Sequence, residues 1–218
     1  MRKLAVGIGW IWLISIPVLA QMDSLPKAEE LYGQAQYKES LSLLDTHASV
    51  PASLFLIGRD YYMLGEFKKA TQYLGKAVIA APKNSEYIDW LGRAYGMRAE
   101  ASNPLSAVVL ARKAKEKFKR AVQLNPKNVD ALSDLFEYYL QVPLVYLQAP
   151  LVLGRRYEKA EAVAEKMSAI DPPKAFFEEA ELAQKRRQLQ TDGPTPRNSV
   201  ALAPKSVGAL VSAAGDAR

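Results

Sequence analysis

The sequence contains no cysteine and only one histidine, His47, among its 218 residues. Without cysteine the chain can form no disulfide, thiolate zinc site or iron–sulfur cluster, and one histidine cannot build a multi-histidine metal site. The sequence also has no glycine-rich phosphate loop and no paired metal-ligand motif. We therefore expect no metal and no cofactor, and we expect a binding protein instead of an enzyme.

His47 itself is a weak candidate for catalysis. It follows Asp45 by two residues, and side chains at that spacing point in different directions on a helix. We interpret His47 as a structural or surface residue. Catalytic sites made only of carboxylates leave little trace in a sequence, so a carboxylate-based hydrolase stays as a less favoured alternative.

The N-terminus has the three parts of a secretory signal. Arg2 and Lys3 form a basic start, an uncharged apolar run follows, and the segment ends in Val-Leu-Ala at Ala20. We predict cleavage after Ala20, so that residues 1–20 are a signal peptide and the protein is periplasmic or secreted. The alternative is an uncleaved inner-membrane anchor, because the apolar stretch is close to the shortest length that spans a bilayer.

An ordered series of large and small residues begins in the second quarter of the chain. Its members are Leu54, Ile57, Gly58, Tyr61, Gly65, Phe67, Ala70, Leu74, Ala77 and Pro82, which is the tetratricopeptide (TPR) pattern. The large residues form the apolar stripe of each helix, while Gly58 and Ala70 let two paired helices approach closely. Gly65 is expected to turn the chain between the helices, and Pro82 to end the second one.

The same order recurs twice downstream, with insertions of about 10 and 12 residues beyond the usual period of about 34. A weaker first repeat precedes it, with Ser24 as the expected N-cap of its first helix and Pro26 in the first turn. We therefore predict an all-α, TPR-like helical-hairpin solenoid with extended helices in the later repeats. Its predicted parts are residues 21–190 as a whole, divided into repeats at about 24–50, 51–84, 85–128 and 129–172.

A further amphipathic helix is expected after the repeats, at residues 174–188. It is expected to cap the stack, because the ends of a solenoid need a polar outer face. The residues expected to face inward are Phe176, Phe177, Ala180 and Leu182 or Ala183. Residues 191–218 are rich in small residues and proline and contain no aromatic residue, so we predict a disordered tail.

Three further runs of residues resemble a group of exported bacterial TPR proteins of unassigned activity. They are Trp90–Gly96, Ala107–Ala114 with Phe118, and Asp134–Gln141 ahead of Ala149-Pro150. The resemblance covers about residues 52–188. It implies the fold and the compartment, and it implies no activity and no catalytic residues. The sequence departs from the group at 153–156, where Leu-Gly-Arg-Arg stands in place of a glycine-rich turn.

The first insertion is expected to lengthen both helices of its repeat. Asn103 is the expected N-cap of the second helix, with Pro104 in the first turn. The residues expected inward are Leu105, Val108, Ala111, Ala114, Phe118 and Ala121. The opposite face carries Arg112, Lys113, Lys115, Lys117, Lys119 and Arg120 against one acid, Glu116. We interpret it as a solvated face, with a docking stripe for anionic lipid or nucleic acid as the alternative. Nucleic acid is the less expected partner, because aromatic residues for base stacking are missing.

The second insertion is a tandem duplication, YLQVPLV at 139–145 and YLQAPLV at 146–152. Each copy carries a helix-breaking proline, so we expect a loop at about 140–153. The loop is almost wholly apolar, and it either folds back over neighbouring helices or docks a protein partner, a second copy or a membrane surface. Its candidate binding residues are Leu144, Val145, Tyr146, Leu147, Leu151 and Val152.

The first helix of each TPR pair lines an inner groove, which gives a second set of candidate binding residues. The candidates for partner contact are Phe55, Arg59, Tyr62, Met63, Asp89 and Arg93, and further groove positions are Glu86, Met97, Asp130, Ser133 and Glu137. Arg59 and Arg93 occupy equivalent places and could donate to an acidic peptide, unless Asp89 pairs with Arg93 four residues away.

The sequence thus predicts a non-enzymatic protein–protein interaction scaffold of the cell envelope. It would bind a peptide or protein in the groove, through the apolar loop, or through both. The alternative is a self-assembling or membrane-surface structural module that uses the duplicated loop.

Overall fold

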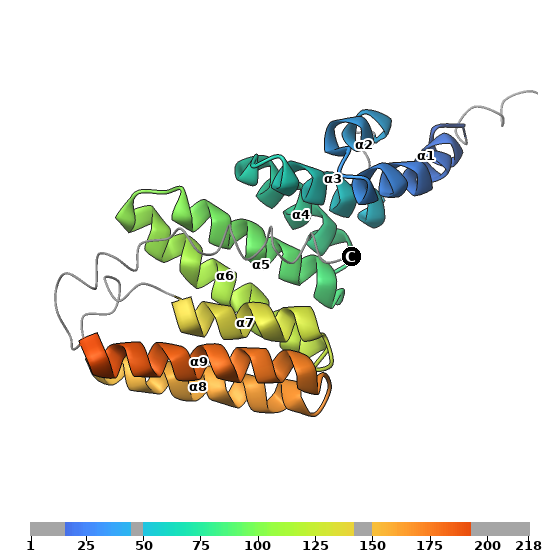
Figure 1. Cartoon of the computed structure of the whole chain (residues 1–218). Helices are drawn as coiled ribbons and strands as arrows, with labels where there is room; N and C mark the ends of the chain where they lie inside the picture. Colours follow the sequence, from blue (N-terminus) through green and yellow to red (C-terminus); the bar gives the residue numbers. More distant parts are fainter. Residues whose placement is uncertain (1–15, 45–49, 142–149, 193–218) are drawn as a thin grey trace, which may run out of the picture. The chain divides into compact units, whose positions relative to one another are not determined.

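The computed structural model describes residues 16–44, 50–141 and 150–192, and within these ranges the chain forms nine α-helices and no strand (Figure 1). The predicted all-α class is confirmed. The helices are α1 (Ile16–Gly33), α2 (Tyr37–Leu43), α3 (Pro51–Met63), α4 (Phe67–Ala80), α5 (Ser85–Glu100), α6 (Pro104–Leu124), α7 (Val129–Gln141), α8 (Pro150–Ser168) and α9 (Pro172–Asp192).

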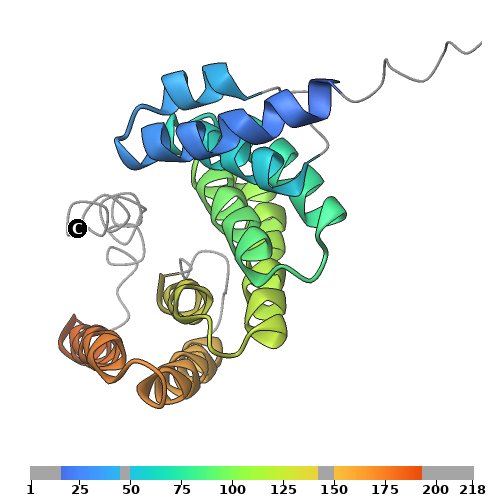
Figure 2. The ribbon, with the colours of Figure 1, turned by 90° about the vertical axis from the view of Figure 1, so that its right-hand side faces the viewer.

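The helices belong to two compact units, residues 1–80 and residues 81–218. In the first unit α1 packs on α2 and α3 packs on α4. In the second unit α5 pairs with α6 and α7 pairs with α8, while α9 packs along α8 (Figures 1 and 2). Contacts also join α5 to α7 and α7 to α9, so the first helices of successive pairs are neighbours, as TPR packing requires.

The first two hairpins turn through the same hydrogen-bonded motif. Gly65, after α3, has a left-handed φ of 76°, and Ala35, after α1, has a φ of 59°. The left-handed residue and the one after it donate to carbonyls three and five positions back: Gly65 to Tyr62, Glu66 to Tyr61, Ala35 to Tyr32 and Gln36 to Leu31. This is the Schellman motif, which favours glycine at the left-handed position. The predicted turn at Gly65 is confirmed, and alanine occupies the same position in the first hairpin at a steric cost.

The predicted start of the first helix at Ser24 is wrong. The helix α1 begins at Ile16, and Pro26 lies inside it. An earlier start is available because Pro17 falls in the first turn, where its missing N–H costs no helical hydrogen bond. The predicted cleavage point after Ala20 therefore falls within α1, and residues 1–15 lie outside the described ranges.

Two glycines determine how closely paired helices approach. A Cβ added to Gly58 on α3 would lie 2.6 Å from Cγ of Leu74 on α4. One added to Gly92 on α5 would lie 2.6 Å from Cε1 of Phe118 on α6. Ala70 on α4 is fully buried. The predicted role of small residues in close helix packing is therefore confirmed.

The long helix α6 begins as predicted, and it buries Ala114, Phe118 and Ala121 as predicted, but its first two turns bury other residues than expected. The side chain of Asn103 accepts the N–H of Ser106 at 3.0 Å, and Pro104 stands in the first turn. Its buried residues are Ala107, Leu110, Ala114, Phe118 and Ala121. The expectation that Leu105 and Val108 face inward is wrong, since both are exposed. Leu105 precedes Ala114 by nine residues, about two and a half turns, which places it on the opposite side.

The helix α8 begins inside the duplicated segment. Pro150 is its first residue, so Leu151 and Val152 are helical instead of lying in a loop. Proline fits there because the first helical residues need no N–H partner. Leu140, at the other end of the expected loop, is buried on α7. The predicted loop residues Leu144, Val145, Tyr146 and Leu147 lie outside the described ranges.

The last residue of the Leu-Gly-Arg-Arg run at 153–156 has a packing role. Arg156 on α8 is 8% exposed, and its guanidinium donates to the carbonyl of Tyr139 at 2.6 Å and that of Tyr138 at 3.4 Å. These carbonyls belong to the last turn of α7, where helix-internal donors are missing. Arg156 therefore ties the beginning of α8 to the end of α7.

The helix α9 is longer than the predicted capping helix and turns a different face inward. Ala175, Glu178 and Leu182 are buried, whereas Phe176 and Phe177 are 68% and 71% exposed. Of the residues expected inward, Leu182 alone is confirmed, and Ala180 and Ala183 are exposed as well. The inward stripe follows spacings of three and four residues from Ala175, and it admits a glutamate because α9 packs against the polar side of α7.

Three other predictions fall where the structure describes little. His47 and residues 193–218 of the expected tail lie outside the described ranges. Thr191 and Asp192, the first two residues of that tail, belong to α9. Among the helices that the structure describes, none combines the length and the apolar character needed to cross a membrane.

Candidate protein-binding face

One side of the second unit gathers polar side chains from three helices. The helix α7 contacts both α5 and α9, so the sides that these helices turn to one another are close in space. Positions three or four residues apart share a side of a helix. Such positions carry Asp89 and Arg93 on α5, Ser133, Asp134 and Glu137 on α7, and Lys174, Glu178 and Glu181 on α9. We call these eight residues the carboxylate face.

Arg93 lies between two aspartates of this face. Its Nε donates to Oδ2 of Asp134 at 2.5 Å and lies 3.3 Å from Oδ2 of Asp89. Asp89 is 1% exposed, and burial, followed by the negative charge of Asp134, raises the pKa of Asp89 well above its ordinary value. The pairing of Asp89 with Arg93 is confirmed. Arg93 is therefore held between two aspartates and is not a free donor for an acidic peptide.

Glu178 is the most buried glutamate of the face. Its Oε1 accepts a hydrogen bond from the hydroxyl of Ser133 at 2.6 Å and lies 3.7 Å from Nζ of Lys174. Its Oε2 is buried without a hydrogen-bond partner among the described residues. Burial raises the pKa of Glu178, while Ser133 and Lys174 oppose that rise. An unsatisfied buried oxygen is costly to the fold, so packing alone does not favour a glutamate here.

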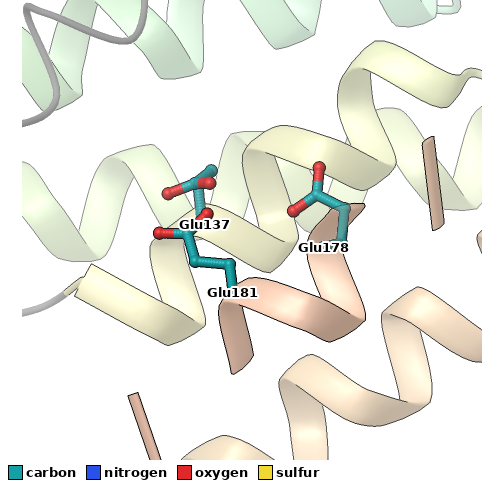
Figure 3. A group of neighbouring side chains, drawn as sticks. All are labelled: Glu137, Glu178 and Glu181. Atoms are coloured by element: carbon teal, nitrogen blue, oxygen red, sulfur yellow. The ribbon is translucent and has the colours of Figure 1, made fainter. Parts of the chain in front are cut away.

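Glu137 lies where three carboxyl groups meet. Figure 3 shows the carboxyl groups of Glu137 and Glu181 next to one another, with Glu178 to one side. The carboxyl of Glu137 also accepts a hydrogen bond from the side-chain amide of Gln141. Burial, followed by the negative charges of Glu181 and Glu178, raises the pKa of Glu137 to about 8. Near neutral pH this carboxyl is therefore mostly protonated, and a cation placed beside it would favour its ionisation.

These three glutamates are also the residues that could hold a metal ion. Their ligand atoms lie within 4.8 Å of one another, and carboxylate oxygens are the ligands that hard divalent cations prefer. No sequence pattern predicts this group, because Glu137 and Glu181 are far apart in the chain and share no motif. Carboxylate clusters are common in proteins without a bound ion, and we assign no metal here.

The predicted groove residues of the first unit lie mainly in its packing. Phe55 and Tyr62 are 7% and 5% exposed. The guanidinium of Arg59 lies over the ring of Tyr32, 4.1 Å from its centroid, and 5.4 Å from that of Phe55. Met63, at the end of α3, is 39% exposed and presents the largest surface of the four predicted residues. Their role in partner binding stays a prediction, and burial favours a packing role for Phe55 and Tyr62.

Four residues of the carboxylate face are absent from the candidates predicted from the sequence: Asp134, Lys174, Glu178 and Glu181. Asp134 could have been found, because it lies four residues after Asp130 and three before Glu137 on the expected groove side. The two glutamates of α9 were missed for a different reason. The aromatic residues of that helix were expected to face inward, and this assignment turned its carboxylates outward.

A polar hollow of about 450 Å³ lies beside this face, at the N-terminal ends of α5 and α7. It is lined by Lys83, Asn84, Ser85, Glu86, Asn125, Asn128 and Asp130. Two of its asparagines cap helices, since Asn84 accepts the N–H of Tyr87 and Asn128 accepts that of Ala131. Ser85 donates to the Ala121 carbonyl at 3.0 Å and accepts from Asn128 at 2.9 Å. These polar groups serve the fold, and we assign no ligand to the hollow.

Comparison with solved structures supports the TPR architecture. The chain is similar to the crystal structure of a thermophilic TPR protein from Thermus thermophilus, with a TM-score of 0.61 and 21% sequence identity. The match covers 90% of this chain and 98% of that one. No protein-family model and no curated protein sequence matches the chain. The protein thus has an all-α, TPR-like fold, and the likeness carries the fold alone.

Proposed function

We propose that the protein is a non-catalytic scaffold that binds a protein partner through the carboxylate face of its second unit. The observation that carries this proposal is the convergence of polar side chains from α5, α7 and α9 on one side of the unit. Packing would favour apolar residues there, as it does on the opposite side of α7, where Leu132, Phe136 and Tyr139 join the core. The first helices of TPR pairs are the elements that line a binding groove in such folds.

The chemistry of the face favours a partner segment with basic residues. Arg93 is paired with two aspartates, and Lys174 lies beside Glu178. Glu137 and Glu181 face one another without a cation among the ion pairs of the described residues. A lysine or arginine of a partner would favour the ionised form of Glu137 and would form charge-assisted hydrogen bonds with both carboxyl groups. The acidic peptide considered from the sequence is disfavoured by this arrangement.

Peptide binding tests this proposal. Fluorescent peptides of equal length, with lysine and arginine, glutamate, or serine at the variable positions, would be titrated with the full chain. We expect the basic peptides alone to bind, with affinity that falls as salt rises. The double variant Glu137→Gln, Glu181→Gln should bind them about three to ten times more weakly. The matched control Glu29→Gln, Glu39→Gln removes two exposed carboxylates of the first unit and should bind as the parent does.

Two outcomes would contradict the proposal. Equal binding of acidic and basic peptides would show that charge at this face selects no partner. An equal loss of affinity for the basic peptides in the Glu137 and Glu181 double variant and in the control would mean that the peptides bind elsewhere on the chain.

A carboxylate-based hydrolase is the second candidate, and one observation favours it. Raised pKa values at Asp89, Glu137 and Glu178 are the property that general acids need. Buried ion networks raise carboxyl pKa values as well, so the raised pKa values alone do not indicate an enzyme. The polar hollow at the N-terminal ends of α5 and α7 is not lined by any of these three residues. Incubation with chromogenic esters and glycosides tests it. Turnover that disappears in Glu137→Gln would support an enzyme, and the absence of turnover in the parent would leave the scaffold.

We further propose that the chain is exported, because its first twenty residues have the order of a secretory signal. Edman sequencing of the protein from a periplasmic fraction should then begin at Gln21. A chain that begins at Met1 and sediments with membranes would support the anchored alternative. In the exported form α1 would lose Ile16–Ala20 and would keep Ala28, which is fully buried in the first unit.

Self-assembly through the duplicated segment stays an alternative, and the tandem copies allow a clean test. Deletion of residues 146–152 places Pro143 where Pro150 stands, so the first residues of α8 keep the sequence Pro-Leu-Val-Leu, while the segment between α7 and α8 becomes seven residues shorter. Light scattering of the parent and the deletion would compare their masses. A smaller mass for the deletion would support assembly through the loop, and equal masses would exclude it.

A further inference from the structure

We propose that the exposed face of α6, together with Lys159 of α8, binds the surface of a membrane that contains anionic lipid. This surface is formed by the second helices of the TPR pairs, so the proposal does not depend on the carboxylate face. Its two components are an apolar end and a basic stretch on the same side of one helix.

The apolar end lies at the beginning of α6. Leu105 is 85% exposed, Val109 is 55% exposed and Val108 is 37% exposed. Leu105 and Val109 are four residues apart and therefore share a side of the helix. Large apolar side chains that are this exposed and lie together are unusual on a surface that contacts only water.

The basic stretch continues along the same side. Arg112, Lys119 and Arg120 are exposed there, with Lys113 at its border, and Glu116 is the single acid between Pro104 and Leu124. Arg112 and Lys119 are seven residues apart, and Leu105 precedes Arg112 by seven, so all three lie close to one line along the helix. From Leu105 to Arg120 the line measures about 22 Å. An amphipathic helix that lies on a membrane combines these same two components.

A second helix adds to the positive charge. The ammonium groups of Lys115 on α6 and Lys159 on α8 lie 5.8 and 5.9 Å from the ring centroid of Tyr139. Burial lowers the pKa of Lys115, and the charges of Lys159, Lys119 and other cations lower it further. Among the ion pairs of the described residues, none joins these lysines to a carboxylate. Cations held together without an acid favour an anion from outside the protein.

The exposed apolar end is the reason to choose lipid over nucleic acid. Leucine and valine gain free energy by entering the boundary between headgroups and acyl chains, and they gain nothing from a phosphate backbone in water. Binding to single-stranded nucleic acid needs aromatic faces on which bases stack. Tyr139, which lies under the lysines, is 8% exposed and cannot offer its face. An anionic bilayer surface attracts each nearby lysine or arginine with about 1 kcal/mol.

Vesicle sedimentation of the full chain tests the proposal. The vesicles contain phosphatidylcholine alone or phosphatidylcholine with phosphatidylglycerol. We expect sedimentation with the anionic vesicles only, and less of it at high salt. The variant Arg112→Gln, Lys119→Gln removes two exposed charges and should weaken binding on the order of tenfold. Leu105→Ser, Val109→Ser should weaken it as well, because buried apolar area contributes to surface binding.

Matched controls come from the first unit. Lys38→Gln, Lys68→Gln removes the same charge from exposed positions on α2 and α4, and Ile79→Ser removes an apolar side chain that is 81% exposed. Both controls should bind as the parent does. All variants carry the same N-terminal segment, so any contribution from residues 1–20 cancels when the variants are compared on the same vesicles. Circular dichroism verifies that each variant keeps its helices.

Three results would overturn the proposal. One is equal sedimentation with neutral and anionic vesicles. A second is binding that the variants of α6 and the controls weaken equally. The third is a parent chain that does not bind anionic vesicles but binds a single-stranded oligonucleotide. If that binding is lost in Arg112→Gln, Lys119→Gln, the face is a nucleic-acid surface.

Discussion

Arg93 on α5 and Asp134 on α7 join two successive helical pairs, with 2.5 Å between Nε and Oδ2. The same guanidinium also lies beside Asp89, which is almost fully buried. One cation therefore holds two carboxylates of neighbouring repeats, and its removal would leave both in a poorly solvated place without a counter-charge.

Arg93→Met should for this reason destabilise the second unit by about 3 kcal/mol. Urea unfolding followed by circular dichroism measures the change. Adding Asp89→Asn to the variant should restore part of the loss, because the buried charge is then gone. Arg120→Met removes an exposed arginine of α6 and should change stability by less than about 0.5 kcal/mol. Equal effects of Arg93→Met and Arg120→Met would mean that the ion pair contributes nothing.

Gly58→Ala and Gly92→Ala should each destabilise the protein by about 1–3 kcal/mol. The added methyl group would overlap Leu74 in the first case and Phe118 in the second. Gly96→Ala on α5 is the control, since nothing lies within 4 Å of its Cβ position, and it should stabilise the helix by up to about 1 kcal/mol. Thermal unfolding of the three variants and the parent ranks their stabilities. A stabilised Gly92→Ala would refute the close approach.

Ala35→Gly should stabilise the first unit by about 1 kcal/mol, because glycine adopts the left-handed φ without the clash that alanine suffers. The reverse change at the matching turn, Gly65→Ala, should destabilise by about the same amount. Gly75→Ala provides the control for backbone entropy, since Gly75 has no left-handed φ and lies within α4. Urea midpoints measured under one condition compare the three. Opposite signs at Ala35 and Gly65 are required by the Schellman geometry.

Asp60→Asn should remove a pH dependence from the stability of the first unit. Asp60 on α3 is fully buried and accepts a hydrogen bond from Ser40 at 2.8 Å, and burial raises its pKa to about 7. Between its ordinary pKa of 3.8 and about 7, the folded state holds a proton that the unfolded state has lost. Stability from this group therefore falls as pH rises through that window, by at most about 4 kcal/mol.

Urea unfolding at several pH values between about 4 and 8 measures this dependence. The parent should lose stability relative to Asp60→Asn as pH rises, and the variant should be the more stable of the two above pH 7. Glu39→Gln changes an exposed acid of α2 and should follow the parent. Parallel curves for the parent and Asp60→Asn would show that Asp60 is ionised in the folded protein at acidic pH.

Much of the fold could be predicted from single residues whose effect is local. Gly65 requires a left-handed turn, Asn103 caps the helix that follows it, and Gly58 leaves space for a neighbouring helix. Such effects depend on a few residues close in sequence, so the pattern alone reveals them. The all-α class and the helical pairs follow from the spacing of large and small residues.

The errors occur where helix periodicity leaves a choice of face. On α6 both Leu105 and Leu110 are apolar, and only packing against α5 and α7 decides that Leu110 is buried. On α9 the inward side takes Glu178 in preference to Phe176 and Phe177. Glu178 accepts a hydrogen bond from Ser133 of α7, which is far away in the sequence, so no local pattern could reveal this contact.

The candidate face was found in part. The sequence indicates Asp89, Arg93 and Glu137 from their shared side of the helices, but it does not indicate which of them neutralise one another. The sequence leaves Arg93 available for a partner because Asp134, which pairs with it, is 41 residues away in the chain. Contacts between helices determine which charged groups of the face are not neutralised by a neighbour. Because Arg93 is paired with two aspartates, the expected partner is basic instead of acidic.

The glycines at 58 and 92 also limit how these hairpins can deform. The missing Cβ of each glycine leaves space for one side chain of the partner helix, so sliding the helix along its partner would move Leu74 or Phe118 out of that space. We therefore expect the two helices of each of these hairpins to keep a fixed register. We therefore expect any adjustment within the second unit at the connections between hairpins, such as the short turn from α6 to α7, where the Arg93–Asp134 ion pair links α5 to α7.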